Sequence, residues 1–205
     1  KTNRDRGRGK PEYELLDTGV FNEDRYFDVF VEYAKAGADD LLVKITAVNR
    51  GPEEAALHVL PTLWFRNDWS SWIAPSNRAS VKPTLTQVAT TDGVSTLHVS
   101  HLELGEYIFS CEGDVPLLFT ENETNHEKLF PGNKNESPYV KDGINDYVIH
   151  SVQDAVNPNK QGTKVAAHYK LTIGAGNTSI IRLRLTKKNG KSNDVAFGKG
   201  FDKIF

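Results

Sequence analysis

The chain contains 205 residues, of which 38% are hydrophobic and 25% are charged, and its formal net charge is −2. A chain of this length buries about 70% of its unfolded surface, so it can fold without disulfides or structural metals. The small net charge gives no general attraction to nucleic acid or to an anionic membrane. The sequence also lacks an apolar run near the ~20 residues that a membrane-spanning helix needs, so we expect neither partner.

The first segment, residues 1–11, is basic and polar and reads KTNRDRGRGKP. This composition is typical of a solvated linker or arm, and it lacks the interleaved aromatic residues of an arm that binds nucleic acid. The chain starts at Lys1 and contains no methionine, so we expect a processed chain or a piece of a longer protein. The polar start and the single cysteine, Cys111, favour a cytoplasmic location.

Residues 12–196 are expected to form one domain of short strands. Apolar and polar side chains alternate with period two over 25–35 and again over 41–49, which is typical of half-buried strands. A third run over 55–65 contains Pro61, which indicates an edge strand or a bulge. We expect these segments to form three consecutive antiparallel strands. The residues expected on one face of the first strand are Phe27, Val29, Val31 and Tyr33.

Further short strands follow along the chain. We expect them around 84–90, 94–100, 106–111 and 116–120, with a final pair over 163–173 and 178–186 that is separated by the turn GAGN. Cys111 ends a strand-like run and is expected to be a small buried hydrophobic residue. Many short strands joined by Gly, Pro and Asn turns, with few helices, predict an all-β fold in the form of a large antiparallel two-sheet β-sandwich.

The last segment, residues 197–205, reads FGKGFDKIF. Its apolar residues recur at the spacing of an amphipathic helix, although Gly198 and Gly200 weaken that pattern. We expect the first turns of a helix that connects to a missing domain.

Two long polar stretches interrupt the strands, and long loops on a sandwich often carry function. The candidate contact residues are Arg66, Asn67, Trp69 and Trp72 in the stretch 66–83, and Glu121, Asn122, Glu123 and Asn125 in the stretch 121–146. Aromatic faces beside planar polar groups suit a sugar or a neighbouring domain. The simpler interpretation is that the tryptophans pin their loop to the sandwich.

Glu121 and Glu123 would lie about 7 Å apart on an extended strand, near the ~6.5–9.5 Å separation of carboxylates in inverting glycosidases. Catalytic carboxylates normally come from different segments, whereas two Glu on one strand edge more often cap turns or pair with Arg and Lys. We therefore assign no catalytic residue. The histidines are scattered without metal-ligand spacing, and no nucleophile elbow or phosphate loop is present, so we expect no metal or cofactor.

Four segments in combination carry a resemblance, namely PEYELLDTGVFNEDRYFDVFVEYAKAGADDLLVKITAVNRGPEEAALHVLPTLWFRNDWSSW, LLFTENETN, SPYVKDGINDYVIH and AVNPNKQGTKVAAHYKLTI. From about Pro11 onward the chain resembles bacterial and archaeal proteins similar to glycoside hydrolase family 63, the family of processing α-glucosidase I (mannosyl-oligosaccharide glucosidase). None of these segments is a catalytic signature.

The resemblance implies the non-catalytic N-terminal domain of such proteins, a supersandwich of the galactose-mutarotase-like kind. In that family it precedes an (α/α)6 barrel that holds the acid and base carboxylates. The implied parent is an inverting enzyme that acts on α-linked, glucose-containing oligosaccharides, and the implied partner is its own catalytic domain. No catalytic residue of the family maps onto this chain.

Three hypotheses therefore stay open. The chain is an accessory sandwich domain that packs on a catalytic barrel, a stand-alone carbohydrate-binding module, or a self-contained hydrolase that uses Glu121 and Glu123. The first hypothesis predicts an exposed apolar or aromatic patch larger than monomers usually tolerate.

Overall fold

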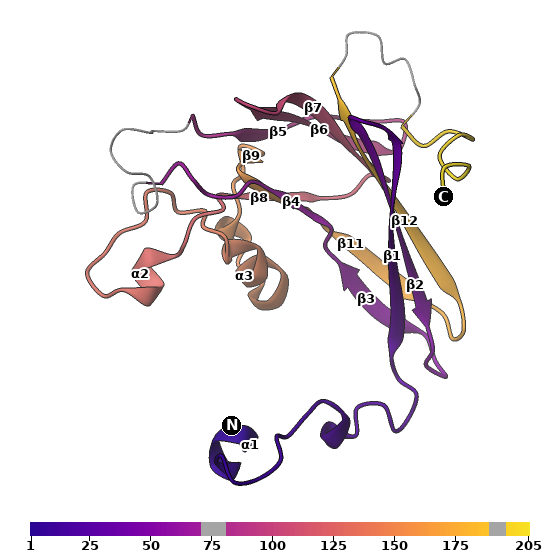
Figure 1. The fold of residues 1–205 in the computed structure, drawn as a ribbon, viewed down its shortest axis with the longest axis vertical. Helices are drawn as coiled ribbons and strands as arrows, with labels where there is room; N and C mark the ends of the chain where they lie inside the picture. The colour runs from indigo at the N-terminus through magenta and orange to yellow at the C-terminus, as the bar shows by residue number, and fades with distance from the viewer. Residues whose placement is uncertain (71–80, 189–195) are drawn as a thin grey trace.

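The computed structural model describes residues 1–70, 81–188 and 196–205 (Figure 1). The chain forms an all-β sandwich of antiparallel strands, which confirms the fold class predicted from the sequence. One layer is a seven-stranded sheet, and the facing layer consists of two smaller sheets. Within the described residues, no helix is long and apolar enough to cross a membrane.

The seven-stranded sheet has an antiparallel pairing at every step. In spatial order its strands are β1 (Phe27–Gly37), β2 (Asp40–Asn49), β12 (Thr178–Lys187), β7 (Gly105–Glu112), β6 (Val94–His101), β5 (Thr84–Thr91) and β9 (Gln161–Gly162). The strands expected around 84–90, 94–100 and 106–111 are thereby confirmed as β5, β6 and β7.

The facing layer is built from two small antiparallel sheets. One sheet has the order β4 (Thr62–Trp64), β10 (Lys164–Ala167), β8 (Leu117–Thr120), and the other pairs β11 (Tyr169–Ile173) with β3 (Ala55–Val59). Only Leu60 and Pro61 separate β3 from β4, and only His168 separates β10 from β11. The two sheets therefore form one layer with a break across its middle.

The hydrophobic core lies between these layers. Phe119 of β8 and Val165 of β10 are at most 1% exposed, and they belong to the same cluster as Leu85, Leu97 and Phe109 of the large sheet. Burying one such side chain completely contributes about 1.5–3 kcal/mol, so this cluster holds the two layers together. Cys111 is also fully buried in it, which confirms the expectation for this residue.

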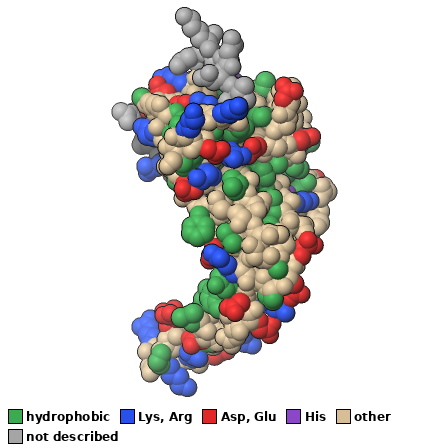
Figure 2. Space-filling model, turned by 90° about the vertical axis from the view of Figure 1, so that its right-hand side faces the viewer, with side chains coloured by type: hydrophobic (Ala, Val, Ile, Leu, Met, Phe, Trp, Pro, Cys, Tyr) green, Lys and Arg blue, Asp and Glu red, His purple; other side chains and the backbone are tan. Residues whose placement is uncertain are grey.

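Short helices decorate the sandwich. They are α1 (Thr2–Arg6), η1 (Leu16–Thr18), α2 (His126–Leu129), α3 (Gly143–His150) and η2 (Gln153–Ala155). Ile144 of α3 packs with Leu118 and Ala166, so this helix covers the outer face of the second layer. The basic segment 1–11 contains α1, none of whose residues is buried, and the N-terminal arm extends from the lower end of the sandwich (Figures 1 and 2).

Two predicted pairings are wrong in the same way. The segment 55–65 does not continue the β1–β2 hairpin but lies in the second layer, and β11 pairs with β3 rather than with β12. The side-chain nitrogen of Asn49 donates to the carbonyl oxygens of Glu53 and Ile173, each at 2.8 Å. This buried side chain thus binds the loop before β3 and the last residue of β11, where the chain passes between the layers.

The prediction of a helix over 197–205 is also wrong, because the structure shows turns over 196–203. Phe201 is 3% exposed, and the centroid of its ring lies 5.6 Å from that of Phe197 and 5.5 Å from that of Phe205. The apolar spacing thus builds a small aromatic cluster in place of a helix face. Gly198 and Gly200 disfavour the helix locally.

Candidate functional site

Two loops meet beyond the ends of β4 and β8. Trp64 at the end of β4 and Thr120 at the end of β8 both lie opposite Lys164 of β10. Because β4 and β8 each run antiparallel to β10, they run in the same direction and their loops leave the layer at the same edge. The register of β10 therefore brings residues 66–70 beside residues 121–125.

Side-chain amides join the two loops directly. Asn122 donates from its amide nitrogen to the carbonyl oxygen of Phe65 at 2.8 Å, and Asn67 donates to the carbonyl oxygen of Asn122 at 3.2 Å. The backbone N–H of Asn122 donates to the hydroxyl of Thr163 at 2.7 Å, which ties the junction to the start of β10. These bonds place Asn67 and Asn122 within a fixed framework.

Glu123 is the centre of the junction and is only 7% exposed. Its Oε1 accepts a hydrogen bond from Trp69 Nε1 at 2.9 Å and another from Lys82 Nζ at 2.9 Å. Glu121 accepts from the hydroxyl of Thr163 at 2.7 Å and lies 3.2 Å from the same Lys82 ammonium group. The indole of Trp69 therefore ties its loop to the second loop through Glu123.

The ammonium group of Lys82 is shared by both carboxylates. Burial acts to lower the pKa of Lys82, but its hydrogen bond to Glu123 and the charge of Glu121 outweigh burial and hold that pKa above its ordinary value. An inverting glycosidase needs one carboxyl that donates a proton and one carboxylate that activates water. Here the carboxylates of Glu121 and Glu123 are both bound to one cation, Lys82.

Asn125 organises the second loop rather than facing the first. Its side-chain oxygen accepts from the backbone N–H of Lys128 at 3.1 Å and thereby caps α2, a role for which Asn is well suited. Its amide nitrogen lies 3.2 Å from a carboxylate oxygen of Asp142, and its oxygen also accepts from Asn135 at 3.1 Å. The stretch 121–146 is thus folded back on itself.

A hollow of about 340 Å³ lies beside this junction. It is comparable in size to the smaller ligand pockets of proteins, and its wall mixes aromatic, amide and charged groups. The side chains around it include Asn67, Ser70, Glu123, His126, Phe130 and Glu136. Such a mixture can contact a polar ligand or a polar surface of another domain.

The remaining predicted residues are placed as follows. Arg66 is exposed next to the junction, and Trp72 lies outside the described residues. Sequence reasoning missed Lys82 and Thr163, which hold the two glutamates. In the sequence Lys82 stands out only as a cation just before Pro83 and the expected strand around 84–90, and nothing around Thr163 indicates its role.

Groups of three or more His, Cys, Asp or Glu side chains that could hold a metal ion do not occur in the ranges 1–70, 81–188 and 196–205. His58 and His168 form a pair of histidines, with 3.2 Å between Nδ1 of His58 and Nε2 of His168. Burial, together with His58 and Lys170, lowers the pKa of His168.

Comparison with known proteins finds a relative of the chain but does not show its family. No model of a protein family matches the chain. The chain is 31% identical over 225 residues to the uncharacterized protein YMR196W of Saccharomyces cerevisiae, an alignment that covers 94% of this chain. It spans about a fifth (20%) of the length of that relative, so this sandwich is similar to one segment of a much longer yeast protein.

Proposed function

We propose that the chain is the non-catalytic β-sandwich domain of an α-glucosidase-type glycoside hydrolase. In this proposal it packs on an (α/α)6 catalytic domain and lends the junction of its two loops to the rim of the active site. The observation that carries the proposal is Lys82, which binds both Glu121 and Glu123. In this proposal the two glutamates hold the loops together, and cleavage takes place in another part of the parent.

Two further points support the proposal. The chain resembles proteins similar to glycoside hydrolase family 63, in which this region is the sandwich that precedes the barrel. The yeast relative is about five times as long as the region to which the chain aligns, so it has room for a second large domain. The proposal includes a cytoplasmic location, which fractionation of cells that express the natural protein would test.

The test compares the 205-residue chain with the longer natural polypeptide that the proposal requires. We expect the longer polypeptide to hydrolyse α-linked glucose oligosaccharides with inversion, so that the first product seen by proton NMR is the β-anomer of glucose. We expect the 205-residue chain to release no glucose. Equal hydrolysis by both would overturn the proposal, and so would no hydrolysis by the longer polypeptide on a panel of α-glucosides.

A rim role is tested in the longer polypeptide by Asn67→Ala. We expect KM to rise severalfold with little change in kcat, since a contact remote from the reacting bond contributes mainly uniform binding. Asn145→Ala, on the exposed side of α3, is the matched control and should leave both constants unchanged. A KM that Asn67→Ala leaves unchanged would remove the rim role.

A stand-alone carbohydrate-binding module is the second candidate, and exposed aromatic side chains favour it. Trp64 is 55% exposed and Tyr33 is 69% exposed. Stacking of a sugar on Trp64 would quench tryptophan fluorescence of the 205-residue chain, and Trp64→Phe would remove the signal. A flat titration with maltooligosaccharides at millimolar concentration would exclude this candidate.

A further inference from the structure

Exposure changes abruptly along one cross-strand row of the large sheet. The row runs from Ser95 of β6 through Cys111, Leu183 and Val43 to Tyr33 of β1, and each step is a direct antiparallel pair. Ser95 and Cys111 are fully buried and Leu183 is 2% exposed, whereas Tyr33 is 69% exposed. Directly paired residues point to the same face of a sheet, so Tyr33 lies on the inner face without a layer above it.

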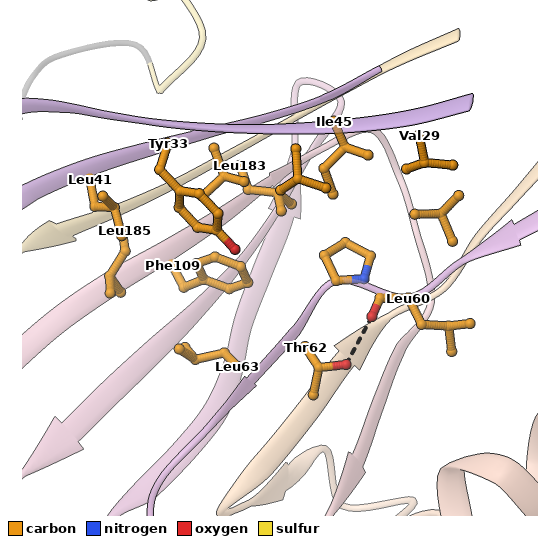
Figure 3. Close-up of a pocket in the computed structure, with 14 residues that line it drawn as sticks. Val29, Tyr33, Leu41, Ile45, Leu60, Thr62, Leu63, Phe109, Leu183 and Leu185 are labelled. Atoms are coloured by element: carbon orange, nitrogen blue, oxygen red, sulfur yellow. Dashed lines mark hydrogen bonds between the residues drawn. The ribbon is translucent and has the colours of Figure 1, made fainter. Parts of the chain in front are cut away.

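The neighbours of Tyr33 on β1 repeat this behaviour. Val29 and Val31 are each 48% exposed, although they pair with Ala47 and Ile45, which are 1% and 6% exposed. A groove of about 350 Å³ lies here. Across it the side chains of β1 and β2 face Leu60 and Leu63, as Figure 3 shows. The face of β1 that alternation predicted to be buried is therefore apolar and inward, but uncovered.

Free strand edges border this groove. Within the described residues, β1 pairs only with β2, β3 only with β11, and β4 only with β10. Such an edge leaves alternate backbone N–H and C=O groups unpaired, and a long apolar edge is a template for another strand. A helix laid in the groove would cover the apolar side chains, but it would leave the edge of β3 and β4 without partners.

We propose that an extended segment of the polypeptide outside residues 1–205 pairs with the free edge of β3 and β4. Because neighbouring strands are about 4.8 Å apart and alternate side chains share a face, one added strand would place every second side chain over Val31 and Tyr33. The segment is therefore expected to alternate apolar and polar residues. It widens the second layer until that layer covers β1.

The comparison with the yeast protein favours the same polypeptide as the source of the added strand. This region corresponds to 20% of the yeast relative, so most of that protein lies outside it and can supply a strand in cis. The inference rests on the proposed function only in requiring a longer polypeptide, and it needs no glycosidase activity. Its test therefore measures coverage of the groove and does not depend on hydrolysis.

Thiol labelling tests the coverage. Cys111 is fully buried and burial raises its pKa to about 12, so we expect it not to react with maleimide at neutral pH. Val31→Cys places a thiol in the groove, and Val88→Cys places the control on β5, where Val88 is 63% exposed. Labelling of each site is read by peptide-resolved mass spectrometry, in the 205-residue chain and in the longer natural polypeptide.

We expect both thiols to react at similar rates in the 205-residue chain. In the longer polypeptide, labelling at position 31 should be at least tenfold slower and labelling at position 88 unchanged. Amide hydrogen exchange over 55–64 should slow as well, because a paired strand protects the edge. Protection of position 31 without slower exchange would mean that another kind of surface covers the groove, and unchanged labelling would mean that nothing does.

A second copy of the chain is the other candidate that could fill the groove. If the 205-residue chain is itself protected at position 31, and this protection grows with protein concentration, the groove is a dimer interface and the proposal is overturned. Light scattering across the same concentrations would show the dimer. Constant labelling of a monomer leaves the extended segment as the occupant to be sought in the longer polypeptide.

Discussion

The two long sides of the sandwich end differently. On one side the chain passes from β9 directly through Thr163 into β10 and so connects the large sheet to the second layer. A Cβ atom on Gly162 would lie 2.3 Å from the carbonyl oxygen of Thr120, so this crossing is in tight contact with β8. On the other side the described residues place β1 at the edge of one layer and β3 with β4 at the edge of the other, with a groove between them.

The chain closes one side of the sandwich with its own contacts and leaves an apolar face exposed on the other side. The closed side positions the loop junction, since Glu121 directly follows Thr120 and binds Thr163. The open side keeps an apolar face that strands of the same amphipathic pattern bury elsewhere in the sheet. The closed side therefore suits a fixed set of polar contacts, and the open side suits a partner segment.

The largest expected effect is in the core near the closed side. Phe119 is fully buried, so Phe119→Ala should lower the free energy of unfolding by about 3–5 kcal/mol. Tyr33→Ala on the open side should cost less than about 1 kcal/mol, because most of that side chain stays in water. Urea denaturation of both variants measures the contrast. Similar losses would mean that the open side is covered in the isolated chain.

A pair of glycine substitutions sharpens the comparison at the strand crossing. Gly162→Ala forces the backbone of Thr120 to move, so we expect a loss of about 1–3 kcal/mol and a shift in the fluorescence of Trp69. Gly37→Ala, at the open edge, meets nothing within 4 Å and should be neutral or slightly stabilising. Thermal unfolding with tryptophan emission checks both. A neutral Gly162→Ala would show that the crossing is not tight.

The ion-pair network at the junction gives a third effect. Glu123→Ala leaves Trp69 Nε1 and the Lys82 ammonium group without one shared partner, so we expect a loss of about 1–2 kcal/mol and a red shift of Trp69 emission. Glu54→Ala, an exposed residue just before β3, is the matched control and should change neither quantity. An unchanged emission maximum in Glu123→Ala would show that Glu123 does not hold Trp69.

The smallest expected effect is a pH dependence of stability that comes from His168, at the break in the second layer. The pKa of this buried histidine is below its ordinary value of 6.5, mainly because burial disfavours the charged ring. The unfolded chain therefore binds the proton first, and this contribution to stability is present above pH 6.5 and is lost as the pH falls below it. Denaturation midpoints between pH 7.5 and 5 should decline less in His168→Gln than in the unchanged chain.

Alternation in the sequence predicted most strands and the fold class, because period two is a local property. It did not predict which layer each strand joins. Val31 and Ile45 show the same apolar alternation, yet one is exposed and the other buried, since the covering strand is set by contacts distant in the sequence. The hairpin expected after Ile173 did not form for the same reason, because β11 pairs with β3, a strand far earlier in the sequence.

The loop junction was partly predictable. Polar and aromatic residues in two interrupted stretches indicated where contacts would gather, and Asn67, Trp69, Asn122 and Glu123 do meet. Lys82 could not be assigned to both glutamates from sequence, since the register of β10 that aligns the two loops is a tertiary feature. The helix α3 was missed although Ile144, Tyr147 and Val148 follow helical spacing, because the segment is short.

Hydrolysis of aryl α-glucosides by the 205-residue chain distinguishes most directly between a structural and a catalytic role for Glu121 and Glu123. With both carboxylates bound to Lys82, we expect no release of the aryl group above the buffer rate, in the unchanged chain and in Glu121→Gln alike. Turnover by the unchanged chain that Glu121→Gln abolishes, with folding intact, would contradict the proposal that this sandwich is a non-catalytic domain.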